Sequence, residues 1–125
     1  MSRTHWHQQA ADATFDGRAL IQGRRVEATD GETFEKHSPI DGRRLGAVAR
    51  GRQADVDAAV AAARRAFEEG RWSRQPPAAR KRVLQRFAEK ILASKDELAL
   101  LETLDMGKPI RYSTSVDVPA AARCI

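Results

Sequence analysis

The residues best suited to chemistry lie in the segment 101–109, which reads Leu-Glu-Thr-Leu-Asp-Met-Gly-Lys-Pro. Gly107 and Pro109 predict that a helix ends here, because glycine accepts the left-handed position after a helix and proline prevents its continuation. Asp105 would then lie in the last turn, where the negative end of the helix dipole disfavours a carboxylate. Lys108, a backbone N–H group or a bound cation could each compensate that charge.

Other reactive side chains stand alone in the sequence. Cys124 has no histidine near it and lies in a predicted helix, so we interpret it as a small buried or half-buried thiol, not as a nucleophile. Glu102 lies one residue from the apolar side of its helix, where an ion pair is a sufficient role. His5 and His7 could bind a transition metal only weakly, since further ligands at suitable spacing are missing. The sequence predicts no catalytic residue, and its glycines form no phosphate-binding loop.

Composition and charge narrow the function classes. The 125 residues carry a formal net charge of +5, which would fit a nucleic-acid-binding module. However, only 6% of residues are aromatic, and Trp72 is the single aromatic residue between Arg71 and Arg86, whereas a stacking platform requires several aromatics among its basic residues. No apolar run is long enough to cross a bilayer, and a single cysteine favours a reducing cytoplasm. We interpret the following basic residues as a solvated face: Arg71, Arg74, Arg80, Lys81, Arg82 and Arg86.

Strand and turn patterns precede helical ones along the chain. Residues 1–15 are polar, and we expect them to form a mobile N-terminal tail. Residues 19–26 and 33–49 each predict a short antiparallel hairpin, the second turning at Asp41 and Gly42. These strands are too short to form a stable sheet alone.

Three helices are predicted after the hairpins, and a fourth begins near Val116. The first ends at Gly70, the second begins at Pro77, and Ser94 with Glu97 predicts a capping box at the start of the third. The apolar positions at helical spacing are Val56, Val60, Ala63 and Phe67, then Leu84, Phe87, Ala88 and Ile91, then Leu98, Leu101 and Leu104. The chain stops inside the fourth helix, so we expect the N-terminal quarter of a larger protein, with apolar faces left bare where missing layers would pack.

Four ordered stretches resemble the N-terminal part of the NAD(P)-dependent aldehyde dehydrogenase superfamily. They are residues 16–23, 33–42 and 55–73 and the Glu-Thr-Leu-Asp-Met-Gly-Lys-Pro string at 102–109. The resemblance covers roughly residues 16–125 and is closest to the branch that oxidises γ-glutamyl-γ-aminobutyraldehyde and related amino-aldehydes. It implies an α/β fold, here the two hairpins, three packed helices and the start of a fourth. Residues 16–125 would be an incomplete portion of the coenzyme-binding domain.

The resemblance also implies an activity for the longer protein. It would oxidise an aldehyde to the carboxylate with NAD or NADP, in polyamine catabolism, as a cytoplasmic homodimer or homotetramer with no nucleic-acid or membrane partner. The thiolate nucleophile, the general base and the dinucleotide site would lie downstream, so we expect this chain by itself to be inactive. The alternatives are a small basic helical nucleic-acid-binding module and a non-catalytic interaction module or gene remnant.

Two family sites would map onto this chain. Many members hold a structural K⁺ or Na⁺ with main-chain oxygens of the second hairpin and an aspartate, and the matching positions are Lys36, His37 and Asp105. The alternative is that Asp105 simply pairs with Lys108 or with nearby amides.

The second family site is the mouth of the substrate tunnel, which the fourth helix borders. Asp117 and Ala120 match positions at this mouth. An acid here could attract the amino group of an amino-aldehyde. Alternatively, Asp117 only complements the positive N-terminus of its helix.

Overall fold

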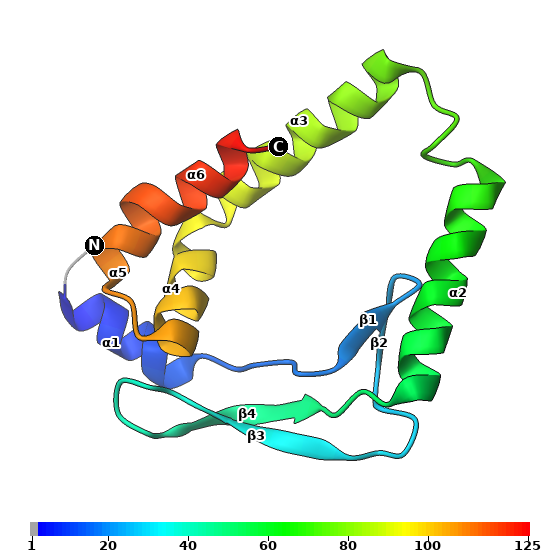
Figure 1. Cartoon of the computed structure of the whole chain (residues 1–125). Coiled ribbons are helices and arrows are strands. Elements are labelled where there is room, and N and C mark those ends of the chain that lie inside the picture. The colour runs from blue at the N-terminus through cyan, green and yellow to red at the C-terminus, as the bar shows by residue number, and fades with distance from the viewer. Residues whose placement is uncertain (1–2) are drawn as a thin grey trace. The chain divides into compact units, whose positions relative to one another are not determined.

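The computed structural model describes residues 3–125, which cluster into two compact units (Figure 1). The hairpin unit consists of Thr14–Lys36 and Arg44–Pro76. The helical unit consists of the described residues up to Ala13, together with His37–Arg43 and Pro77–Ile125.

The first hairpin of the hairpin unit turns tightly. Strand β1 (Ala19–Ile21) pairs antiparallel with β2 (Arg24–Val26), with Ala19 opposite Val26. The two turn residues, Gln22 and Gly23, have φ angles of 53° and 74°. Two consecutive positive φ angles give a turn whose twist matches that of the strands, which is why the short loop closes this hairpin. The predicted hairpin at residues 19–26 is confirmed.

The second hairpin is also confirmed, and an unpredicted bridge joins it to the chain segment before β1. Strand β3 (Thr33–His37) pairs with β4 (Arg44–Ala49). The backbone at Gly17 forms a parallel bridge to Val48 of β4, and the Ala49 N–H group donates a hydrogen bond to the Gly17 carbonyl at 2.9 Å. This bridge ties the start of the unit to β4.

Helix α2 (Gln53–Glu69) completes the hairpin unit and ends at Gly70 as predicted. Gly70 has a φ of 74°, and its N–H group donates to the Phe67 carbonyl at 3.1 Å, which closes the last turn. The apolar stripe of α2 is exposed: the exposed fractions are 54% for Val56, 61% for Val60 and 63% for Phe67. The expectation of bare apolar faces is therefore confirmed for α2.

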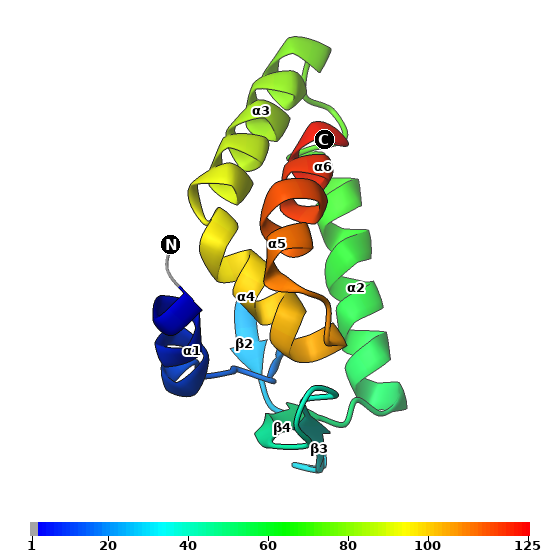
Figure 2. The same ribbon diagram turned by 90° about the vertical axis from the view of Figure 1, so that its left-hand side faces the viewer.

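Helices form most of the helical unit: α3 (Pro77–Ala93), α4 (Lys95–Met106), the short α5 (Ile110–Tyr112), a π-helical turn η1 (Ser113–Asp117) and α6 (Val118–Arg123). Helix α6 lies alongside α3, and α4 contacts both (Figures 1 and 2). The buried apolar residues here are Ala99, Leu100, Leu104, Val118 and Ala122. Helices α3, α4 and α6 thus pack through a small core of α4 and α6 residues. The first of the three predicted helices, α2, belongs instead to the hairpin unit.

Two details of the predicted helices are wrong. Helical backbone resumes at Ile110 with α5 and η1, earlier than the predicted start near Val116, and the extended backbone of Pro109 directly precedes it. Helix α6 itself begins at Val118. The capping box of Ser94 and Glu97 does not form, since the Ser94 side chain makes no cap hydrogen bond. Ser94 continues the end of α3 with a near-helical backbone, and its N–H group donates to the Lys90 carbonyl. A capping side chain normally requires extended backbone at that position.

A helix also occupies the region predicted to be a mobile tail. Helix α1 spans Arg3–Asp12, while residues 1 and 2 lie outside the described residues. Arg43 Nη2 donates a hydrogen bond of 2.6 Å to the Ala10 carbonyl, one of the unpaired carbonyls at the end of α1. The apolar side of α1 is weak, so this helix depends on tertiary contacts that composition does not reveal. Within residues 3–125, no helix is both long and apolar enough to cross a bilayer.

Candidate functional site

A lysine and two carboxylates meet inside the helical unit. Lys108 Nζ lies 2.5 Å from Asp117 Oδ2 and 3.9 Å from Glu102 Oε1. The hydrogen bond to Asp117 is the main reason that the pKa of Lys108 is raised. Glu102 therefore has the ion pair expected for it. The positive charge of Lys108 compensates most of the negative charge of Asp117 in this structure.

The π-helical turn η1 explains how Asp117 reaches Lys108. Ser113 is fully buried, and its Oγ atom lies 3.2 Å from Oγ1 of Thr103. This hydrogen bond between two hydroxyl groups joins η1 to α4. Thr114 and Ser115 donate their hydroxyl hydrogens back to the carbonyls of Ile110 and Arg111. Hydroxyl groups that bond back in this way locally widen a helix. The Ser-Thr-Ser run was the sequence signal for this turn, and sequence reasoning missed it.

Asp117 also lines a pocket between α3, α4 and α6. The volume of this pocket is about 530 Å³, and its lining is mainly apolar. Glu102 and Asp117 supply two carboxylates and Lys90 one ammonium group, and the apolar lining residues are Phe87, Ile91, Leu98, Val118 and Ala121. An apolar surface that ends at carboxylates suits an aliphatic chain with a cationic head group. Ala120 of α6 is half-buried and does not line this pocket. The structure thus places one of the two predicted entrance residues at a pocket.

The predicted cation-binding residues lie in different parts of the chain. Lys36 and His37 are consecutive residues at the end of β3, where the hairpin unit meets the helical unit in sequence, and Asp105 belongs to the helical unit. Asp105 is exposed in the last turn of α4, just before the left-handed Gly107. Among the described residues, no three or more His, Cys, Asp or Glu side chains cluster as a metal site. A cation would need main-chain oxygens, so its binding by these residues stays a prediction.

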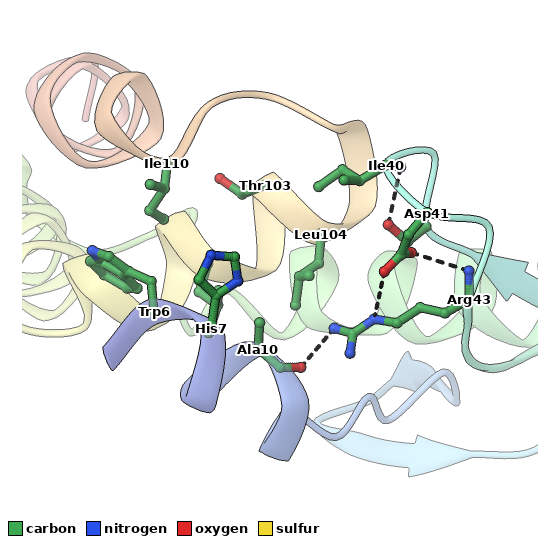
Figure 3. A pocket seen from close by; sticks show the side chains of 11 residues that line it. Trp6, His7, Ala10, Ile40, Asp41, Arg43, Thr103, Leu104 and Ile110 are labelled. Carbon is green, nitrogen blue, oxygen red and sulfur yellow. Dashed lines mark hydrogen bonds and ion pairs between the residues drawn. The ribbon is translucent and has the colours of Figure 1, made fainter. Parts of the chain in front are cut away.

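A further pocket of about 600 Å³ lies between α1, residues 38–43 and α4 (Figure 3). Trp6 and His7 of α1 face Thr103 and Leu104 of α4 across it. Arg43, which also lines it, is engaged by the Ala10 carbonyl and by Asp41, whose Oδ2 lies 3.8 Å from Arg43 Nε. We assign no chemistry to this pocket, because its charged groups hold α1 and the hairpin turn in place.

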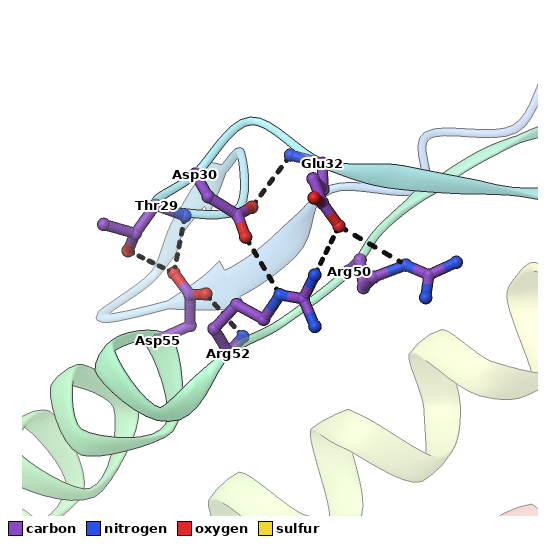
Figure 4. Close-up of polar contacts among 6 residues, drawn as sticks. All are labelled: Thr29, Asp30, Glu32, Arg50, Arg52 and Asp55. Carbon is purple, nitrogen blue, oxygen red and sulfur yellow. Dashed lines mark hydrogen bonds and ion pairs between the residues drawn. The ribbon is translucent and has the colours of Figure 1, made fainter.

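A network of charged residues organises the start of α2 in the hairpin unit (Figure 4). Asp55 accepts hydrogen bonds from the Arg52 N–H group at 2.8 Å and from the Thr29 N–H and hydroxyl groups at 2.9 and 2.5 Å. Arg52 extends the network by pairing with Asp30 and Glu32. The backbone hydrogen bond from Arg52, followed by the Thr29 hydroxyl, lowers the pKa of Asp55. These internal pairings indicate a structural role.

Comparison with known proteins decides the family. A model described as "Aldehyde dehydrogenase family" matches residues 26–125. The chain belongs to the aldehyde dehydrogenase family. The family resemblance of the sequence motifs and the expected fold class are both confirmed.

Individual aldehyde dehydrogenases are similar in sequence to nearly the whole of this chain. It is 46% identical to the Escherichia coli (strain K12) "NADP/NAD-dependent aldehyde dehydrogenase PuuC", over 97% of this chain and 24% of PuuC. The structure of gamma-glutamyl-gamma-aminobutyraldehyde dehydrogenase from Burkholderia cenocepacia J2315 is 52% identical, with a TM-score of 0.96 over 99% of this chain and 25% of that one. A mutant of P. syringae AldA, an indole-3-acetaldehyde dehydrogenase in complex with NAD⁺ and IAA, is 50% identical, with a TM-score of 0.96 over 98% of this chain and 25% of that one. The chain spans about a quarter of the length of these relatives.

Proposed function

We propose that these residues form the N-terminal part of an NAD(P)-dependent aldehyde dehydrogenase that oxidises γ-glutamyl-γ-aminobutyraldehyde or a similar amino-aldehyde to the carboxylate. The observation that carries the proposal is the similarity to the Burkholderia cenocepacia enzyme, with a TM-score of 0.96 and 52% identity. The similarity to PuuC supports the same activity. An acid at position 117, beside an apolar pocket, is compatible with a substrate that carries an ammonium group.

In this proposal the chain supplies scaffold and the reactive groups lie elsewhere in the enzyme. NAD(P) would accept the hydride, but the glycines with positive φ within residues 3–125 occupy turns and helix ends: Gly23, Gly31, Gly42, Gly70 and Gly107. In this proposal the phosphate groups of the coenzyme are bound by a part of the enzyme outside these residues. The exposed apolar stripe of α2 and the exposed Val83, Phe87 and Leu92 of α3 are surfaces that further layers of an enzyme could cover. We propose that the assembled enzyme is a cytoplasmic homodimer or homotetramer.

The activity of the complete enzyme tests this proposal. We expect it to form NAD(P)H when given an amino-aldehyde, as followed by the near-ultraviolet absorbance of the reduced coenzyme. Residues 1–125 alone should give no turnover, since they contain none of the expected reactive groups. Turnover by residues 1–125, or a complete protein that oxidises no aldehyde, would contradict the proposal. Retention of nucleic acid in a salt-sensitive filter-binding assay would instead favour the basic-module alternative.

We also propose that the Asp105 carboxylate and the main-chain oxygens of Lys36 and His37 bind K⁺ or Na⁺ in the complete enzyme. A hard cation prefers oxygen ligands, and the negative end of α4 lies beside Asp105. Thermal unfolding should occur at a higher temperature in potassium or sodium chloride than in tetramethylammonium chloride of equal ionic strength. Asp105→Asn should remove this difference, whereas Asp57→Asn, at an exposed position in α2, should keep it. An equal dependence on the salt in all three proteins would refute the cation site.

A further inference from the structure

Lys108 has two possible carboxylate partners that are not equivalent. Its ammonium group is in hydrogen-bonding range of Asp117 at 2.5 Å, whereas Glu102 at 3.9 Å is only an ion-pair neighbour. The side chains of all three residues are partly exposed, at 38% for Lys108, 25% for Asp117 and 28% for Glu102. Two anions therefore share one cation, and a small rotation of a flexible lysine side chain would exchange its main partner.

We propose that Lys108 is an internal competitor for cationic substrates: its ammonium group occupies the position on Asp117 that a substrate ammonium group would take, and Glu102 accepts Lys108 when it is displaced. This inference rests on the proposed function, and on Asp117 as the carboxylate that attracts the substrate. In it, Lys108 and Glu102 are positioning residues that set the preference between charged and neutral aldehydes.

The surroundings of Asp117 favour this exchange. Its Oδ2 atom is buried, and Asp117 lines the 530 Å³ pocket, where the apolar side chains of Phe87, Ile91 and Val118 can cover an aliphatic chain. A substrate ammonium group that approaches Asp117 is repelled by the ammonium group of Lys108, so each cation weakens the binding of the other to this carboxylate. Glu102 lowers the cost of displacing Lys108 because it keeps the displaced ammonium group paired.

The π-helical turn η1 holds Asp117 in a fixed position relative to Glu102. Ser113 is completely buried and lies beside Thr103 of α4, so η1 is fixed against the helix that carries Glu102. Lys108 lies on the connection between α4 and α5, and α5 continues into η1. Both carboxylates are thereby held on ordered elements on either side of a lysine whose own side chain is long and flexible.

Steady-state kinetics of the complete enzyme tests the proposal with two substrates. One is an ω-amino-aldehyde with a free ammonium group, and the other is an unbranched aldehyde of equal length without it, whose KM is the internal reference. Lys108→Met should lower the ratio of the KM for the cationic substrate to the KM for the neutral one about threefold to fivefold, since an ion pair at a partly exposed site is of this size. Lys108→Arg, which keeps the charge, should restore a ratio close to that of the original enzyme.

Substitution of Glu102 or Asp117 should change the KM ratio in the direction opposite to Lys108→Met. Glu102→Gln removes the alternative partner of Lys108, so the KM ratio should rise about twofold to threefold. Asp117→Asn should raise the ratio as well, and adding Lys108→Met to it should then have no further effect. Lys81→Met, at an exposed position in the first turns of α3, is the matched control for loss of one positive charge and should leave the ratio unchanged.

The outcomes separate this inference from the proposed function. If the neutral aldehyde is oxidised but Lys108→Met and Glu102→Gln leave the KM ratio unchanged, the competition is refuted and the dehydrogenase assignment stands. The competition is likewise refuted if Lys81→Met changes the ratio as much as Lys108→Met, because the effect would then be one of net charge. If neither aldehyde is oxidised by the original enzyme, the proposed function itself fails.

Discussion

Replacing Gly17 by alanine should lower the free energy of unfolding of the hairpin unit by about 2–4 kcal/mol, because the new methyl group has no space. A Cβ atom at this position would overlap the Ala47 carbonyl oxygen and lie 2.7 Å from the Val48 Cα atom. Both are backbone atoms of β4, so no side-chain rotation can relieve the contact. The bridge from Gly17 to Val48 and the hydrogen bond to Ala49 would have to break or shift.

Urea unfolding followed by the fluorescence of Trp72, which lies in the hairpin unit, measures this effect once Trp6 is replaced by phenylalanine. Gly46→Ala, in strand β4, is the matched control. A Cβ atom there would lie 3.5 Å from the Phe15 Cβ atom, an ordinary contact, so the change should stay within about 1 kcal/mol. If both variants unfold at the same urea concentration, the close approach at Gly17 does not exist in solution.

Replacing Asp55 by asparagine should lower the thermal unfolding temperature by several degrees at neutral pH. An asparagine can keep one acceptor oxygen toward Thr29, but its amide nitrogen cannot accept the hydrogen bond from the Arg52 N–H group. The start of α2 would lose the acceptor of the Arg52 N–H group, and only the link through Thr29 to the loop that precedes β3 could remain.

The pH dependence of this variant has a definite sign. Asp55 has a lowered pKa in the folded chain, so its stabilising effect is present at pH values above the ordinary aspartate pKa of about 3.9. This effect disappears as the pH falls from that value through the lowered pKa of the folded state. The difference between the original chain and Asp55→Asn should therefore shrink in acid. Asp57→Asn, in the same turn but exposed, should show a much smaller difference at every pH, and an equal difference would refute the role of the network.

The hairpins and most helix ends could be predicted from the sequence because local turn chemistry determines them. Gly70 and Gly107 adopt the left-handed backbone that their positions after apolar helical runs indicated. Asp41 and Gly42 likewise marked the turn between β3 and β4. In each case the deciding interaction lies within a few residues, so a sequence pattern contains it.

The elements that were missed depend on partners far away in the chain. Helix α1 is held through Arg43, more than thirty positions away, and its own sequence gives little helical amphipathicity. The failed capping box at Ser94 has a similar cause, since the direct continuation from α3 fixes the Ser94 backbone.

For the candidate site, the sequence by itself determined the family, the residue types and the end of α4, because these depend on ordered motifs and on local backbone preferences. It left the partner of Lys108 open and missed α5 and η1, which precede α6. Only the tertiary structure decided that Asp117 and Glu102 share Lys108, because the packing of η1 against α4 through Ser113 and Thr103 brings together residues that no local rule connects.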